Sequence, residues 1–434
     1  MKFVDLFAGL GGFHKALSQL GHSPVLASEI RNDLRILYKE NWGIYPEGDI
    51  VELVESNFHK IPDHDILCAG FPCQPFSKAG YRKGTADSRG TLFDYIEKIL
   101  HKKRPNYIIL ENVPHLKNLN KGKTLSEILI RLKSLGYDVK HRIYSPHEFG
   151  IPQKRDRLFI IGSLSGLNDF NFDNIDKSKT QVIEIEKYID DDYENEYKIS
   201  NEGIRAIEMW QNLIDLIPSD QNLPGFPIWS MEFGADYPLD IPLSRLNQKD
   251  LDIYKGCYGE SLRGLKKSNQ LSKIPTYSLS TKKLPSWKIN YILKNREFYR
   301  SNKEAIDPFM LTLKEFSFST FQKFEWNISE ERIPISDCII QFRPSGIRVK
   351  KPDFFPSLVC SSNQIPIIGW KNRYLSLKEA SKLQGLEGIR LPEFRTAAIK
   401  SIGNAVNADI VKLIAKELIS EKVIDAESKL ELVR

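Results

Sequence analysis

The sequence lacks a long hydrophobic run, a leader-like N-terminus and a paired set of cysteines. No apolar stretch in the 434 residues approaches the ~18 residues that a membrane-spanning helix needs. The five cysteines are odd in number and form no CxxC pair, which argues against a disulfide framework or a zinc site and favours a reducing compartment. The first residues, MKFVDLFAGLGG, show no basic segment followed by a small-residue cleavage site. We therefore expect a globular protein with no membrane span, no metal and no signal peptide.

The sequence also lacks a strong net charge, but one stretch is strongly basic. The formal net charge is +6, which alone says little about partners. Residues 255–303, in contrast, contain 12 Lys and Arg against two Glu, with Tyr, Trp and Phe interleaved. Such a strip is typical of a phosphate-binding surface, and a solvated face with a few core aromatics has the same composition. From charge alone the two interpretations are about equally good.

Short apolar strands alternate with amphipathic helices over residues 1–165. The strand candidates are residues 3–7, 24–30, 65–70, 107–112 and 157–162. Between them, apolar side chains recur at helical spacing, and a glycine ends the helices that follow the first and fourth candidates. This alternation predicts a doubly wound α/β sheet with helices on both faces, in which ligands bind at the carboxyl ends of the strands.

The regular alternation stops near residue 165. An acidic segment at 184–196, a helix candidate at 199–217 and Pro-rich, aromatic stretches follow. Regular patterns return late, with a capping box formed by Ser376 and Glu379 and with a C-terminal amphipathic helix. We expect a first domain over residues 1–185, a mixed and irregular second domain over 186–395, and a return to the first domain over 396–434.

The segment DLFAGLGGF (residues 5–13) predicts a nucleotide cradle, because a strand and a glycine turn lead into a helix N-terminus. Its spacing is GLGG and not GxGxxG, which weakens a dinucleotide site and an NAD-dependent oxidoreductase. Glu29, at the end of the second strand, suits a ribose diol. Asp49 and Ile50 follow a third turn and suit an adenine. The pattern fits an adenosyl ligand without a pyrophosphate, and a structural tight turn remains the alternative.

Three further groups follow strands that should end in the same crevice. Cys73 stands in GFPCQPFS, between prolines that stiffen the turn, and a thiolate there would be a nucleophile. Glu111 ends the strand YIILEN, where burial would raise its pKa and make it a proton donor. In QKRDR, the alternate residues Gln153, Arg155 and Arg157 share one side if the chain is extended. Each group alone also has an ordinary structural explanation, as a buried thiol, a cap or a surface charge cluster.

Together these groups suit methylation of a pyrimidine carbon. A thiolate that adds to C6 converts the ring into an enamine, whose C5 can attack an electrophilic methyl group. The addition needs a proton or hydrogen bond at N3, which Glu111 can give. It also needs a cation near O2, which Arg155 or Arg157 can supply.

The order of these motifs resembles that of the DNA (cytosine-5)-methyltransferase family of bacterial restriction-modification type. DLFAGLGG, GFPCQPFS, ENV, QKRDR and GNAV (403–406) appear in the family's order. RYLSLKEASKLQGL (373–386) resembles the penultimate motif, with Leu386 where Phe is common and Lys382 where Arg is common. The matching blocks cover residues 1–162 and 340–410. The stretch between them corresponds to the family's variable target-recognition region.

The resemblance implies a fold and a set of site residues. The fold is α/β, a Rossmann-like doubly wound mixed sheet of the class I S-adenosylmethionine-dependent methyltransferase type, with a smaller, irregular α+β target-recognition domain. The implied catalytic residues are Cys73, Glu111, Gln153, Arg155 and Arg157. The implied cofactor-binding residues are Phe7, Gly9, Leu10, Gly12, Glu29, Ile30, Asp49, Ile50, Pro72, Leu92, Asn404 and Val406. The implied DNA contacts are Ser77, Arg89, Lys282, Lys283, Arg296 and Arg300.

The resemblance also implies partners. The substrate would be double-stranded DNA, with a cytosine extruded into the pocket. The methyl donor would be S-adenosylmethionine, the product S-adenosylhomocysteine, and no metal would take part. Residues 77–92 look like the family's mobile loop, which closes over the substrate. We expect a monomer in a bacterial cytoplasm, associated with the nucleoid, that works alongside a restriction endonuclease without physical contact.

Two other interpretations stay open. A transfer RNA cytosine-5 methyltransferase of the DNA-enzyme type would share every catalytic motif, but the long basic insert and the absence of a Cys-Phe-Thr signature favour DNA. An inactive DNA-binding homologue is opposed by the presence of all candidate catalytic residues. The recognised DNA sequence does not follow from residues 165–340, because base-edge contacts depend on their fold.

Overall fold

The computed structural model describes residues 1–72, 91–191, 197–218, 220–221, 223–280, 282–328, 331–358 and 364–419. The chain forms two compact units. Unit 1 comprises Met1–Asp192, Asp353–Ser362 and Ser376–Arg434, and unit 2 comprises Tyr193–Pro352 and Asn363–Leu375. The chain thus returns to unit 1 for good at residue 376, earlier than residue 396, where the sequence pattern placed the return.

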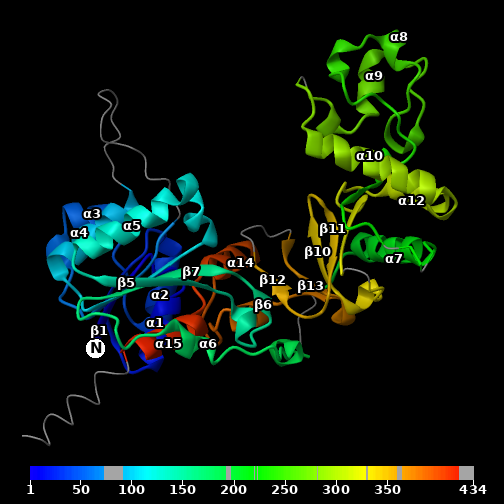
Figure 1. Cartoon of the computed structure of the whole chain (residues 1–434). Coiled ribbons are helices and arrows are strands. Elements are labelled where there is room, and N and C mark those ends of the chain that lie inside the picture. Colours follow the sequence, from blue (N-terminus) through cyan, green and yellow to red (C-terminus); the bar gives the residue numbers. More distant parts are fainter. Residues whose placement is uncertain are drawn as a thin grey trace, which may run out of the picture. The chain divides into compact units, whose positions relative to one another are not determined.

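Unit 1 is built on a six-stranded sheet with the order β2-β1-β3-β4-β7-β5 (Figure 1). The strands are β1 (Lys2–Leu6), β2 (Ser23–Ser28), β3 (Ile66–Gly70), β4 (Tyr107–Asn112), β5 (Asp138–Tyr144) and β7 (Arg157–Ser163). The first four pair in parallel, whereas β7 is antiparallel to both β4 and β5. Every residue of β4 is buried, which explains why its sequence lacks polar alternation.

Helices cover both faces of this sheet (Figure 1). They include α1 (Gly12–Gln19), α2 (Asn32–Trp42), α3 (Ile50–Glu55), α4 (Leu92–Lys103), α5 (Lys123–Ser134), α6 (Phe172–Asp176), α13 (Leu377–Lys382), α14 (Arg395–Asn404) and α15 (Ala408–Ile419). Alternate side chains of β1 point to opposite faces of the sheet. Val4 and Leu6 belong to the hydrophobic core that α3, α4 and α5 share. Phe3 contacts His14 of α1 on the other face. Helix α15 packs against α1, so this late helix lies beside the first helix of unit 1.

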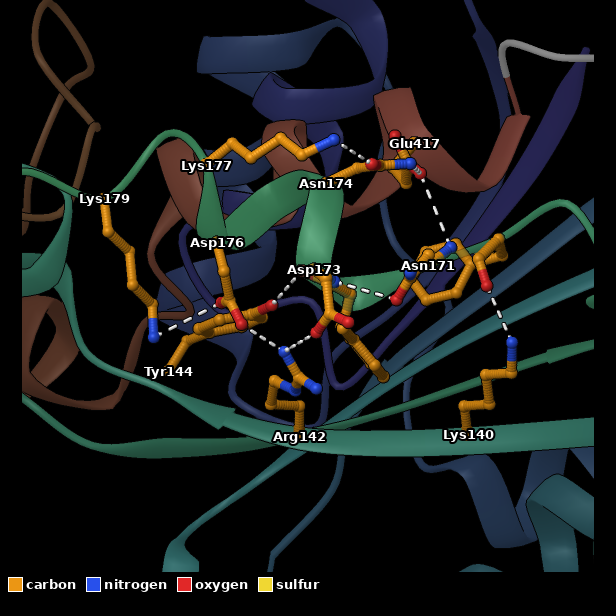
Figure 2. Close-up of polar contacts among 12 residues, drawn as sticks. Lys140, Arg142, Tyr144, Asn171, Asp173, Asn174, Asp176, Lys177, Lys179 and Glu417 are labelled. Atoms are coloured by element: carbon orange, nitrogen blue, oxygen red, sulfur yellow. Dashed lines mark hydrogen bonds and ion pairs between the residues drawn. The ribbon is translucent and has the colours of Figure 1, made fainter.

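The edge strand β5 carries polar side chains because α6 covers it through polar contacts (Figure 2). Lys140 donates to backbone carbonyls of the segment that leads into α6. Arg142 pairs with Asp173 at 3.1 Å, and Asn174 donates to Glu417 of α15 at 2.7 Å. A strand whose faces are both partly polar has no hydrophobic alternation, so β5 is not recognisable from the sequence pattern.

The early return to unit 1 has a local cause. Ser376 and Glu379 form the predicted capping box at the start of α13. Glu379 is fully buried, and its carboxylate also accepts the backbone N–H of Asp190 at 2.8 Å. The Asp190 side chain lies 2.6 Å from Nζ of Lys382. These contacts hold α13 in unit 1.

Unit 2 contains a second six-stranded sheet, with the order β14-β13-β10-β11-β9-β8. The strands are β8 (Ile228–Trp229), β9 (Lys323–Asn327), β10 (Ile339–Arg343), β11 (Gly346–Lys350), β13 (Ile367–Ile368) and β14 (Arg373–Tyr374). Helix α7 (Asn201–Asp215) buries Trp210, which stacks on Phe324 of β9 at 4.9 Å between ring centroids. Because these strands come from distant segments, their order cannot be predicted from local sequence patterns.

The basic stretch folds as a helical part of unit 2. It contains α9 (Lys267–Ser272) and α10 (Ser286–Ser301), and α8 (Gln248–Leu251) packs on α9. Figure 1 shows α10 between the sheet and these two short helices. A separate small core lies under α8 and α9, with Leu251 and Leu262 at its centre. Among the described residues, no helix combines the length and apolar character needed to cross a membrane.

Candidate active site

The glycine turn after β1 adopts backbone conformations that its residues explain. Phe7 has φ 57° and Gly9 has φ 54°, so the chain turns sharply after the strand. A Cβ on Gly12 would lie 2.4 Å from the carbonyl oxygen of Val406, so only glycine permits this approach. The late GNAV motif is therefore in contact with the first glycine turn. Phe7 is a non-glycine residue in the left-handed region, a kind of strain that clusters at functional sites.

A pocket in unit 1 lies at the carboxyl ends of β1, β2, β3 and β4. Predicted site residues account for six of its lining residues: Phe7, Gly9, Glu29, Glu111, Asn404 and Val406. The others are Ala8, Phe13, Arg31, Leu34, Gly70, Ser401 and Ala405. The pocket thus brings together the glycine turn, the acidic end of β2, the end of β4 and the GNAV segment.

Glu29 is held in a fixed position at this pocket. Its carboxylate accepts the backbone N–H of Gly9 at 3.0 Å and that of Arg31 at 2.9 Å. The first bond ties the end of β2 to the glycine turn. Each carboxylate oxygen has a further lone pair for a ligand hydroxyl. Ile30, predicted beside Glu29, points away and is 70% exposed.

Several predicted cofactor residues lie outside the pocket lining. Asp49 accepts the backbone N–H of Val51 and caps α3, and Ile50 is buried behind it. Leu10 and Gly12 are buried within and just after the turn. Pro72 is exposed after β3, and Leu92 is the first residue of α4.

Glu111 and Arg157 form an ion pair beside the pocket. Glu111 Oε1 lies 2.9 Å from Arg157 Nε, and both side chains are largely buried. Burial raises the pKa of Glu111, while Arg157 and Arg155 act in the opposite direction, and the net pKa is above its ordinary value. Gly70, the last residue of β3, is the registered neighbour of Glu111 in the sheet. A carboxyl with a raised pKa therefore lies where the chain leaves β3 toward Cys73.

Arg155 and Gln153 lie behind this pair. The Arg155 guanidinium donates to the backbone carbonyl of Ala405 at 2.8 Å, so it connects QKRDR to GNAV. Gln153 is completely buried, and its side-chain oxygen accepts a hydrogen bond from Gln384. Gln384 belongs to the KLQGL segment, and no motif marks it as a site residue. Of the two arginines, Arg157 is the one beside Glu111.

Cys73, Ser77 and Arg89 lie outside the described residues. The segment that leads into Cys73 is fixed, because Asn112 donates its side-chain amide to the Phe71 carbonyl at 2.9 Å. Cys68, within β3, is completely buried, and burial raises its pKa well above the ordinary value. That thiol fits a structural role.

The predicted DNA contacts of unit 2 divide into two groups. Lys282 and Lys283 are exposed, and Arg300 is exposed and pairs with Glu297 at 2.6 Å. Arg296 differs, because its side chain is 11% exposed and its Nε lies 3.1 Å from the fully buried Glu232. The structure does not support Arg296 as a DNA contact. An internal carboxylate 64 residues earlier in the chain neutralises it, which a local charge count cannot reveal.

Among the described residues, no cluster of three or more His, Cys, Asp or Glu side chains is arranged to hold a metal ion. In one pocket of an α/β fold, the glycine turn, Glu29 and the GNAV segment lie next to the Glu111–Arg157 pair. We therefore take this pocket as the candidate active site.

Comparison with known proteins agrees with this assignment. Residues 1–227 match the family model described as C-5 cytosine-specific DNA methylase. The chain is 29% identical over 489 residues to the type II methyltransferase M.AluI of Cellulosimicrobium cellulans, covering 96% of this chain and 91% of that protein. It is 43% identical over 172 residues to M.HhaI of Haemophilus parahaemolyticus, covering 40% of this chain and 52% of that protein.

A solved structure supports the fold alone. The S. pombe Dnmt2 methyltransferase aligns with a TM-score of 0.50 and 17% identity, covering 97% of this chain and 98% of that chain. The chain belongs to the C-5 cytosine-specific DNA methylase family, because the family model covers more than half of it. The predicted fold class is confirmed, and so is the predicted function, methylation of cytosine at C5 in DNA.

Proposed function

We propose that unit 1 binds S-adenosylmethionine and methylates a cytosine flipped out of a short, specific sequence of double-stranded DNA, through a transient bond between Cys73 and C6 of the base. One observation carries this proposal: Glu111, paired with Arg157, lines the same pocket as the glycine turn and Glu29. The donor and the target base would therefore meet in one cavity of unit 1. Such adjacency is what a direct methyl transfer requires.

The pocket residues fit an adenosyl ligand. The Glu29 carboxylate is oriented by two backbone N–H groups and has lone pairs left for a ribose diol. The close contact between Gly12 and Val406 makes a tight wall, and Asn404 offers an amide at the same pocket. When bound, the ligand would supply an electrophilic methyl group. We further propose that Asp49, Ile50, Pro72 and Leu92 border the adenine.

Glu111 and the arginines would prepare the base. A carboxyl with a raised pKa holds its proton to a higher pH, and it can donate that proton, or a hydrogen bond, to N3 of cytosine. Arg157 lies close enough to Glu111 to place a cation near O2. Arg155 and Gln153 would hold this arrangement from behind, through the Ala405 carbonyl and Gln384.

Cys73 would carry the covalent step. Its thiolate would add to C6, and the electron pair released toward C5 would attack the methyl group as the bond from methyl to the donor sulfur breaks and a neutral thioether leaves. Loss of the C5 proton then allows the sulfur to leave, so the thiolate is regenerated. Ser77 and Arg89 are proposed to contact DNA from the segment that follows.

We also propose a place for the enzyme in a restriction-modification pair. The relatives M.AluI and M.HhaI are named type II methyltransferases. By analogy, this chain would protect DNA from a separate restriction endonuclease that cleaves the same sequence, without contact between the two proteins. Methylated DNA from cells that express the chain should resist one such endonuclease.

A trapping experiment tests the mechanism. Duplex DNA that contains 5-fluorocytosine at the target should form a stable covalent adduct, because fluorine cannot leave C5 as a proton does. The Cys73→Ser variant should form no adduct and should bind S-adenosylmethionine with nearly unchanged affinity. Duplex DNA and transfer RNA tested side by side decide the substrate, and labelling of the RNA alone would overturn the DNA assignment.

A further inference from the structure

Behind the glycine turn, four side chains form a cluster that the proposed mechanism does not use. They are Asp5 of β1, His14 of α1, and Tyr38 and Trp42 of α2. The Tyr38 hydroxyl donates to Asp5 Oδ2 at 3.2 Å and lies 2.8 Å from His14 Nδ1. The His14 ring stacks on Trp42, with 4.7 Å between centroids. None of the four lines the pocket.

Trp42 contacts the glycine turn directly. Its indole N–H donates to the Leu10 carbonyl at 3.1 Å. The same nitrogen would lie 2.3 Å from a Cβ on Gly11, so the ring edge fills the space that this glycine leaves. Helix α2 begins just after Glu29 and Arg31. Trp42 therefore links the two segments that line the adenosyl side of the pocket.

The hydrogen bonds among Asp5, Tyr38 and His14 are not needed to stabilise the core at these positions. Asp5 is completely buried, and Tyr38 and His14 are nearly so. Burial raises the pKa of Asp5 well above its ordinary value and lowers that of His14 to about 4, so both groups favour their neutral forms. Well-packed hydrocarbon at such positions is often as stable or more so. The two hydrogen bonds of the Tyr38 hydroxyl instead orient the side chains, because they fix the Tyr38 and His14 rings relative to Asp5.

We propose that Trp42 is a positioning residue for the methyl donor, and that the Tyr38 hydroxyl, bridging Asp5 and His14, holds it in place. By fixing the Leu10 carbonyl, Trp42 sets the conformation of the turn that presents Gly9 and Phe7 to the pocket. This inference rests on the proposed function, because it takes the pocket to be the S-adenosylmethionine site. Its effect is on donor binding and not on the chemistry at cytosine.

Two variants of the full-length chain test this. Trp42→Phe keeps a ring for stacking and loses the hydrogen bond to Leu10, and Tyr38→Phe removes only the bridging hydroxyl. Titration calorimetry with S-adenosylhomocysteine should show a Kd raised about tenfold in Trp42→Phe, the size of one lost hydrogen bond. Tyr38→Phe should show a smaller rise. The KM for S-adenosylmethionine should rise in parallel, with kcat and the KM for DNA within about twofold of the unaltered chain.

Tyr137→Phe is the matched control. Tyr137 is buried in the same unit, and its hydroxyl donates to the Pro105 carbonyl at 2.8 Å, away from the pocket lining. It should lower Tm about as much as Tyr38→Phe and leave the Kd unchanged. Unchanged Kd values in both test variants, with Tm lowered as in the control, would mean that the cluster is only structural and would overturn the inference. Failure of the unaltered chain to bind the ligand would instead overturn the proposed function, and this inference with it.

Discussion

Two buried glutamate–arginine pairs, one in each unit, look alike in distance and burial. Glu111 lies 2.9 Å from Arg157 in unit 1, and Glu232 lies 3.1 Å from Arg296 in unit 2. Their surroundings differ. Glu111 lines a pocket, whereas Glu232 is fully buried and also accepts hydrogen bonds from two tyrosine hydroxyls, those of Tyr237 and Tyr277.

The two pairs differ in whether a ligand can reach the carboxylate. The donors around Glu232 leave it little capacity for anything else, so its pair connects α10 to the segment before it. Glu111 pairs with Arg157 and lines the pocket, so one side of its carboxylate is accessible from the pocket. A ligand can therefore complete its hydrogen bonding. Access to a pocket, and not the ion pair itself, distinguishes Glu111 from Glu232.

The largest effect that this comparison predicts is on turnover. Glu111→Gln keeps the shape of the side chain and loses the proton donor, so we expect turnover to fall ~10²–10⁴-fold. Glu232→Gln should retain turnover per folded molecule within about twofold, because Glu232 lies in unit 2 away from the lining residues. Methyl incorporation into duplex DNA, normalised to folded protein, measures both. Equal losses of turnover in the two variants would mean that Glu111 and Glu232 do not differ in their contribution to catalysis.

The second effect is on stability, and here we expect the larger loss at Glu232 and not at Glu111. Glu232→Gln leaves Arg296 as a buried charge without its carboxylate partner, which costs ~3 kcal/mol of unfolding free energy. Urea denaturation of the purified chain measures this loss. The double variant Glu232→Gln with Arg296→Met is the control, since it removes both charges. It should be less destabilised than the sum of the single variants, and strict additivity would contradict an ion pair.

The contrast also shows what the sequence can and cannot predict. Glu29 and Glu111 were predicted because an apolar strand that ends in a carboxylate has a recognisable pattern, and the sheet brings such ends together. Arg296 was assigned to DNA because its neutralising partner lies 64 residues earlier and is reached only through the fold. Nonlocal pairing of this kind leaves no mark on local charge density.

Apolar and short elements were missed for related reasons. Phe13 and Leu34 line the pocket, but they have the same helical spacing as ordinary core residues. The sheet of unit 2 includes strands as short as Ile228–Trp229, which are below the length at which periodicity is detectable. No sequence pattern singled out Trp42, because its proposed role depends on a hydrogen bond to a carbonyl 32 residues earlier in the chain.

The third prediction compares exposed and buried cations of the basic stretch. If Lys282 and Lys283 contact phosphates, replacing both by Gln should reduce the slope of log Kd against log salt by about 1.8, or ~0.9 per lost contact. Arg296→Met should leave the slope unchanged in the folded fraction, because the guanidinium is internal. Fluorescence anisotropy with labelled duplex DNA measures both slopes. A change in the slope for Arg296→Met would show that Arg296 contacts DNA after all.

The smallest effect concerns the pH dependence of stability at Glu111, because Arg157 and Arg155 offset part of the effect of burial. The folded-state pKa of Glu111 is raised above its ordinary value of 4.5, so the folded chain holds this proton more tightly than the unfolded chain. The resulting stability is fully present below that ordinary value and is lost as pH rises through the folded pKa. Glu111→Gln has no such proton, so its unfolding free energy relative to the unaltered chain should rise across that window and then level off. Urea midpoints measured at pH steps from 4 to 8 test this, and a relative free energy that falls with pH would mean that Arg157 dominates and that Glu111 is held ionised.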